Sequence, residues 1–126
     1  MASNDKGVAV SGWMYVPELE YPVPVKRVFV NATGTGDTAV VSAVADRRIR
    51  VLSFSVIATL LNTVHFRGAT TPISATMPIA AAAASGGYVR PHEPHGWFQT
   101  AVGVALNVNM SVATATGVDV TYIEVP

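Results

Sequence analysis

The residue types best suited to chemistry lie together in one short stretch, His92-Glu93-Pro94-His95. A zinc-protease helix places two histidines four residues apart on one face, with a glutamate beside the first. Here the histidines are three apart and a proline lies between them, so that motif is absent. A loop could bring both imidazoles to one metal ion, with Glu93 or His65 as the third ligand. A rigid loop whose imidazoles cap backbone groups or pack on an aromatic ring explains the same residues, and we expect this second arrangement.

Other patterns for catalysis are missing from the chain. No G-x-S-x-G nucleophile elbow occurs, and the serines and threonines lie at alternating strand positions or in turns. The glycines of residues 33–37 lack the lysine and the following helix of a phosphate loop, so they predict a turn. Glu18 and Glu20 lie in a proline-rich segment, and the other acids are isolated in sequence. We therefore predict no catalytic residue, no cofactor and no metal.

The composition indicates a small domain that covers part of its surface with something else. The chain has 126 residues, one domain's worth, of which half are apolar and only 13% are charged. A soluble domain usually carries about 25% charged residues. We therefore expect copies of the chain, or a partner, to cover some of its surface. Eight basic and eight acidic residues cancel, which argues against nucleic acid and anionic membranes as partners.

The chain has no cysteine, so disulfides and thiolate metal sites are excluded. The first fifteen residues do not resemble a signal peptide, and the longest apolar stretch, residues 77–84, contains a proline. That stretch is far shorter than the ~20 residues of a membrane helix. We expect a soluble protein made in a cytoplasm. The basic cluster of Arg47, Arg48 and Arg50 predicts either a solvent-facing start of a strand or a patch that pairs with an acidic neighbour.

The clearest element lies near the end of the chain. In residues 106–112 apolar side chains alternate with Asn107, Asn109 and Ser111, the period of a strand with one wet and one dry face. A short break at residues 114–117 leads into a second apolar run, residues 118–122. The two runs predict a β-hairpin and place the chain in the all-β class.

Further strands are predicted at residues 26–30, 38–44, 48–58, 61–67 and 76–84. The apolar phase slips within 48–58, which predicts a β-bulge or burial on both faces. The five alanines within 76–84 favour a helix by propensity, but a proline and a glycine pair bracket the run, so we expect a strand. About eight short antiparallel strands in all predict a jelly-roll-like β-sandwich.

Residues 1–37 differ from the rest and predict an extended N-terminal arm and linker, with the β-sandwich domain at residues 38–126. Prolines oppose a helix in this segment, and its aromatic residues are unlike a disordered tail. Either the arm docks on a partner, or it covers an edge of the domain's own sheet.

Two stretches resemble a pattern found in small structural proteins of tailed bacteriophages. The first is Ser-Gly-Gly-Tyr-Val-Arg-Pro at residues 85–91, a glycine pair followed by an extended loop. The second, at residues 96–111, is Gly-Trp-Phe-Gln-Thr-Ala-Val-Gly-Val-Ala-Leu followed by the alternating Asn and Ser strand. The basic turn and apolar strand of residues 44–66 also resemble these proteins. The similarity covers residues 38–126 and leaves out the arm.

The resemblance implies a jelly-roll virion protein of the head decoration or cement type, which clamps the lattice of the major capsid protein. It would be made in the host cytoplasm and lie on the capsid surface. Copies of the chain would associate, with a trimer as the first expectation by analogy. Aromatic residues dominate interface hot spots. The expected interface residues are Trp13, Tyr15 and Tyr21 on the arm, and Arg90, His92 and His95 on the loop that follows residue 89.

Three alternatives remain at the level of sequence. The protein could belong to the phage tail, as a baseplate or fibre-associated module. It could be a carbohydrate-binding module, because Trp97 beside polar loop residues could stack on a sugar, although a tryptophan at the start of a strand is usually core. It could be a small enzyme centred on the two loop histidines.

Overall fold

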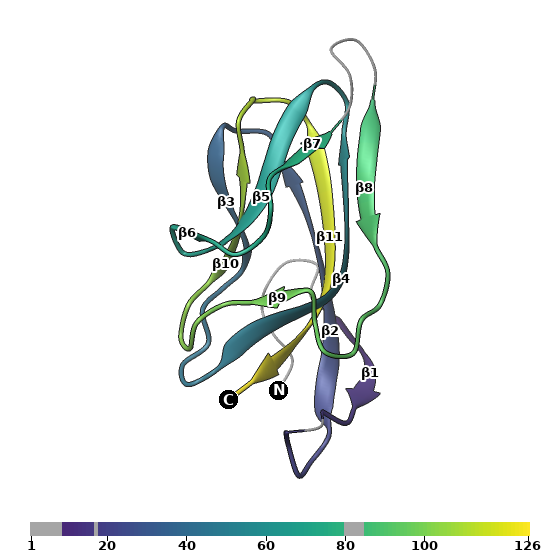
Figure 1. The fold of residues 1–126 in the computed structure, drawn as a ribbon, viewed down its shortest axis with the longest axis vertical. Helices are drawn as coiled ribbons and strands as arrows, with labels where there is room; N and C mark the ends of the chain where they lie inside the picture. Colours follow the sequence, from purple (N-terminus) through teal and green to yellow (C-terminus); the bar gives the residue numbers. More distant parts are fainter. Residues whose placement is uncertain (1–8, 17, 80–84) are drawn as a thin grey trace.

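A computed structural model describes residues 9–16, 18–79 and 85–126, and over these residues the chain forms eleven β-strands and no helix. The strands form two antiparallel sheets that pack face to face (Figure 1). The six-stranded sheet has the order β1 (Ala9–Met14), β2 (Val23–Ala32), β11 (Thr116–Val125), β4 (Arg48–Ala58) and β8 (Gly86–Arg90), with β9 (Phe98–Gln99) also paired to β4. The five-stranded sheet has the order β3 (Gly36–Val41), β10 (Leu106–Met110), β5 (Asn62–Gly68) and β6 (Thr71–Pro72), with β7 (Met77–Ile79) also paired to β5.

The connectivity is that of a jelly roll. Eight strands form four antiparallel pairs in which the first pairs with the last: β2 with β11, β3 with β10, β4 with β8 and β5 with β7. Successive pairs lie in opposite sheets, so the chain is a long two-stranded ribbon rolled into a sandwich. The predicted jelly-roll-like β-sandwich is confirmed. The three strands beyond the eight expected are β1, β6 and β9, of which the last two have only two residues each.

The predicted terminal hairpin is wrong. Both strands exist, but β10 pairs with β3 and β5, whereas β11 pairs with β2 and β4 in the other sheet. Residues 111–115 therefore cross from one sheet to the other. The alternating pattern is the same in both arrangements, because each strand turns one apolar face towards the shared core.

The phase slip predicted in residues 48–58 is a β-bulge. The bounds of β4 match the prediction, and its register against β11 shifts opposite Thr121 and Tyr122, which leaves Leu52 as the extra residue. Val51 lies in the main core between the sheets, whereas Leu52 is buried in a second apolar cluster. The bulge therefore explains how two consecutive apolar residues can both be buried.

The second cluster shows where the N-terminal segment lies. Its buried residues are Val16, Val23, Leu52, Ile123 and Val125. Met14, at the end of β1, and Leu19 pack against these residues, so part of the N-terminal segment covers one end of the chain's own six-stranded sheet. The placement of residues 23–32 in an arm outside the sandwich is corrected, because β2 lies between β1 and β11 and adds Val28 to the main core.

Of the strand predicted at residues 76–84, the structure describes the first part, where β7 spans Met77–Ile79. The five alanines that left helix and strand in competition are residues 80–84. Residues 80–84 and 1–8 lie outside the described residues. Within the described ranges, no helix has the length and apolar character needed to cross a membrane.

Candidate interaction site

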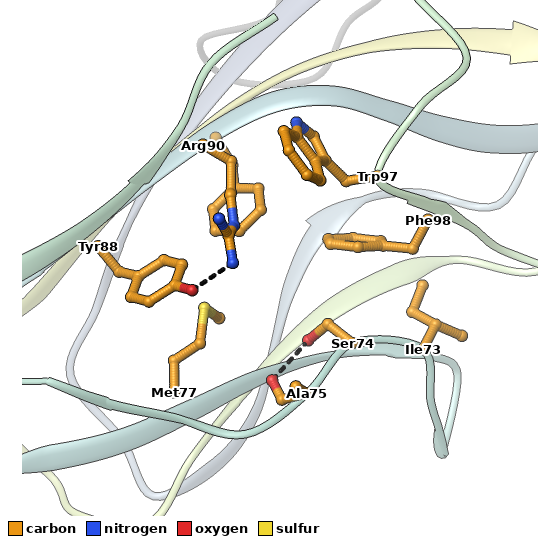
Figure 2. Close-up of a pocket in the computed structure, with 9 residues that line it drawn as sticks. Ile73, Ser74, Ala75, Met77, Tyr88, Arg90, Trp97 and Phe98 are labelled. Atoms are coloured by element: carbon orange, nitrogen blue, oxygen red, sulfur yellow. Dashed lines mark hydrogen bonds between the residues drawn. The ribbon is translucent and has the colours of Figure 1, made fainter. Parts of the chain in front are cut away.

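The main core opens into an aromatic recess at the edge between the sheets (Figure 2). Its volume is about 240 Å³. Phe54 of β4, Tyr88 and Arg90 of β8, and Phe98 of β9 come from the six-stranded sheet. The other lining residues are Ile73, Ser74, Ala75 and Met77, from the connection into β7, and Trp97.

The wall of this recess holds a guanidinium group between two aromatic rings. The Arg90 Cζ atom lies 4.9 Å from the centre of the Tyr88 ring and 5.1 Å from that of Trp97. Arg90 also donates a hydrogen bond to the Tyr88 hydroxyl, and the Trp97 indole N–H donates to the Pro91 carbonyl at 2.8 Å. Among the described residues no carboxylate pairs with Arg90. The cation is thus held by π-systems and has no counter-ion there.

The floor of the recess is continuous with the core. The Phe54 ring lies 5.0 Å from Phe66 and 5.7 Å from Phe98, centre to centre, and Phe66 lies 5.1 Å from Phe98. Tyr88 stacks on Phe54 at 6.4 Å. Tyr88 and Phe98 were not among the predicted site residues, although Tyr88 lies two residues before Arg90 and Phe98 directly follows Trp97. Their shared location follows only from the pairing of β4 with both β8 and β9.

The loop of residues 91–97 is fastened to β4 beside the bulge. The backbone N–H groups of Glu93 and Trp97 donate to the Leu52 and Val51 carbonyls, at 2.9 and 2.8 Å. Gly96 has a φ of +83°, and a Cβ atom there would lie 2.5 Å from the Arg50 Cγ atom. Trp97 is 40% exposed at the rim of the recess, so the expectation that it belongs to the core is corrected.

The predicted histidines of this loop face different surroundings. The Glu93 carboxylate accepts hydrogen bonds from the backbone N–H of His95 at 3.0 Å and lies 3.2 Å from its Nδ1. Hydrogen bonds from His95, chiefly from its backbone N–H and secondly from its side chain, hold the pKa of Glu93 below its usual value. His92 borders a shallow groove with Arg27 and Asp119 on the outer face of the six-stranded sheet. No group of three metal-ligating side chains gathers around one point in the described part of the chain.

The predicted aromatic anchors of the N-terminal segment all face solvent. Trp13 is 68% exposed, Tyr15 77% and Tyr21 48%. Trp13 and Tyr21 border one groove of about 260 Å³ together with Arg47 and Glu124, whereas Tyr15 lies outside it. Trp13 lies in β1, which over the described residues is an edge strand paired with β2, and Tyr15 directly follows that strand.

Arg50 joins the N-terminal segment to the loop that carries Trp97. Its Nη1 lies 2.5 Å from a carboxylate oxygen of Glu18, and Gly96 packs against its aliphatic stem. The hydrogen bond from Arg50 holds the pKa of Glu18 below its usual value. One member of the basic cluster therefore forms the predicted pair with an acidic neighbour, which brings both predicted interface segments to one end of the sandwich (Figure 1).

The two outer faces of the sandwich differ in character. On the six-stranded sheet Phe29, Ile57 and Val89 are exposed, and Phe29 and Val89 lie in one row across the strands through Asp119 and Ser55. On the five-stranded sheet the corresponding face is polar, where Arg67 and Asn109 both hydrogen-bond Asp37. Sequence reasoning missed the exposed apolar residues, although Val28 and Phe29 alternate inward and outward within one predicted strand.

Comparisons with protein-family models, with curated proteins and with solved structures find no match. The fold and the site define a jelly-roll β-sandwich with an exposed tryptophan on its edge strand β1 and an aromatic recess lined by the guanidinium group of Arg90.

Proposed function

We propose that this protein is a non-enzymatic virion structural protein of tailed bacteriophages, a head decoration or cement protein that binds the major capsid protein. The observation that carries the proposal is the exposed aromatic pair beside the edge strand β1, where Trp13 of that strand and Tyr21 border one groove. The resemblance of residues 38–126 to small phage structural proteins points to the same class.

An edge strand offers a row of free backbone donors and acceptors, so a partner strand can add to it. Flanking aromatic side chains then supply most of the binding free energy, because they bury large areas at low cost in conformational entropy. A protein that binds the assembled lattice and not the free capsid subunit stabilises the lattice by mass action. No active site is needed for this role.

The test is cosedimentation of the purified protein with purified heads of the phage. Wild-type protein should saturate at a fixed ratio to the capsid subunit. The variant Trp13→Ala/Tyr21→Ala should bind at least about tenfold more weakly, with its fold retained because both side chains are exposed. The matched control is Leu60→Ala/Leu61→Ala, which removes exposed apolar side chains from the connection after β4 at the other end of the sandwich.

Equal binding of wild type and this aromatic variant would reject the aromatic pair as the contact, and no binding of wild type would reject the capsid function. Deleting residues 1–25 is a poorer test. That deletion removes Val16 and Val23 and so uncovers Leu52 and Ile123. Absence of the protein from heads together with its presence in tails would favour the tail or baseplate alternative.

The exposure of Trp97 favours a second candidate function, carbohydrate binding. A partly exposed indole at the rim of a recess is a group on which a sugar can stack. In a Trp13→Phe variant the remaining fluorescence comes from Trp97. Saturable quenching by a member of a sugar panel would support this function, and an unchanged spectrum across the panel would reject it.

A further inference from the structure

We propose that the aromatic recess receives Tyr15 of a second copy of this chain, with Glu20 of that copy paired to Arg90. The contact gives a geometry to the self-association expected from the sequence, and it does not depend on the proposed binding to the capsid. It joins two different surfaces of the chain, the recess beside β8 and the turn that follows β1.

The recess has the properties of an anchor pocket for a single side chain. At about 240 Å³ it lies below the roughly 300–1,000 Å³ of pockets that take whole small-molecule ligands. Phe54, Met77 and Phe98 make it mostly apolar, and Met sulfur and aromatic edges suit an aromatic occupant. Hydroxyl groups come only from Ser74 and Tyr88 among the lining residues, which is few for a sugar.

Arg90 determines the charge of the occupant. Its guanidinium is partly buried against two rings, and in the described residues it faces no carboxylate. A partly desolvated cation without a counter-ion favours a partner that brings an acid. The occupant should therefore carry an aromatic ring and a carboxylate close together.

The chain itself presents such a pair. A hydrogen bond from the Leu19 N–H to the Val16 carbonyl, at 2.9 Å, brings together the ends of a turn, and Tyr15 and Glu20 directly flank it. Tyr15 is 77% exposed, and Glu20 is exposed and forms no ion pair with any residue that the structure describes. We call Tyr15 and Glu20 the knob.

The knob is held rigid before any contact forms. Val16 and Leu19 pack into the second apolar cluster, and Glu18 pairs with Arg50. Presenting Tyr15 in this way lowers the entropy lost on association. Because knob and recess are different surfaces, the contact is heterologous, and repeating it closes a ring if the rotation permits. A trimer, the first expectation by analogy, would be one such ring.

The test is sedimentation velocity of the full chain over a concentration series. Wild type should associate, and Arg90→Glu, Glu20→Arg and Tyr15→Ala should each raise the dissociation constant at least about tenfold. Combining Arg90→Glu and Glu20→Arg in one chain should restore association, because the charges are then exchanged at every contact. Tyr21→Ala, which removes a neighbouring exposed tyrosine outside the knob, is the matched control and should leave association unchanged.

A wild-type protein that stays monomeric at every concentration would overturn the contact, as would Arg90→Glu variants that associate like wild type. Failure of the exchanged charges to restore association would also overturn it. Head binding is a separate readout. A protein that stays monomeric and binds heads would reject the contact and support the capsid function. A protein that associates but does not bind heads would support the contact and reject the capsid function.

Discussion

Gly96 is the residue on which the position of Trp97 depends. Its φ of +83° is unfavourable for a side chain, and a Cβ atom there would meet the Arg50 stem at 2.5 and 2.9 Å. We expect Gly96→Ala to lower the free energy of unfolding by about 1–3 kcal/mol, because Arg50 must move away from Glu18. Urea unfolding followed by tryptophan fluorescence measures this change.

Gly103→Ala is the matched control for that substitution. Gly103 has a φ of +73°, but a Cβ atom there would have no heavy atom within 4 Å. It therefore tests the backbone conformation without the clash, and it should cost less than Gly96→Ala. Equal decreases in the free energy of unfolding of the two variants would show that the clash with Arg50 does not contribute to the effect of Gly96→Ala.

For single residues, the sequence predicts exposure at a surface better than it predicts the neighbouring side chains. Aromatic residues in a proline-rich segment indicated exposed anchors, and Trp13, Tyr15 and Tyr21 are all exposed. Arg90 was expected on an interaction surface, but the rings that hold it could not be named. Tyr88 lies two residues before it and Trp97 seven after it, and only the tertiary fold brings both rings to one guanidinium.

The crossing between the two sheets is the element that sequence pattern could not predict. Asn62, at the start of β5, holds it in place with a buried side chain. Its oxygen accepts from the Val112 N–H at 3.1 Å, and its Nδ2 donates to the Thr116 hydroxyl at 3.3 Å. One amide thus connects the strand to both sides of the segment that links β10 and β11.

We expect Asn62→Ala to lower the free energy of unfolding by about 1–3 kcal/mol, because buried polar groups lose their partners. The midpoint of urea unfolding should fall while its slope is unchanged. Asn107→Ala is the control, since Asn107 is partly exposed on the outer face of β10 and bonds a loop carbonyl, Ala69 O. Its loss should stay within about 0.5 kcal/mol. Equal losses would contradict the role given to Asn62.

Strand positions were predictable because apolar periodicity is local, whereas strand partners were not. The bounds of β4 and its bulge follow from the order of Ile49, Val51, Leu52 and Phe54 along the chain. The same kind of pattern suggested a hairpin for β10 and β11, since alternation shows that a strand has one buried face but not which strand lies beside it. In a rolled ribbon the neighbours come from distant sequence, as β2 and β11 do.

At the scale of the whole molecule, one end of the sandwich gathers the features that distinguish it from a plain jelly roll. There the N-terminal segment, the β4 bulge and the loop with Trp97 meet around Arg50. The division at residue 38 was predicted from composition alone. It failed for β2 because a proline-containing strand still pairs along most of its length with β11, over residues 26–32.

The stability of that end should depend on pH through Glu18. The pKa of Glu18 lies below its usual value of 4.5 when folded, chiefly because of the hydrogen bond from Arg50. A depressed carboxyl pKa contributes stability that is complete above the unfolded value and is lost as the pH falls through the folded value. The pairing of the N-terminal segment with Arg50 should therefore weaken below about pH 4.5.

We expect Glu18→Gln to be less stable than wild type at pH 7. The urea unfolding curves of the two proteins should converge as the pH falls below the pKa of Glu18 in the folded protein. Some acid sensitivity should persist in the variant, because the pKa of Glu93 is also lowered, by hydrogen bonds from His95. Urea midpoints measured between pH 3 and 7, at a concentration where the chain is monomeric, test this directly. High salt should narrow the difference at pH 7, because the pair is partly exposed. A constant difference between variant and wild type at every pH would show that Glu18 acts through packing and not through its charge.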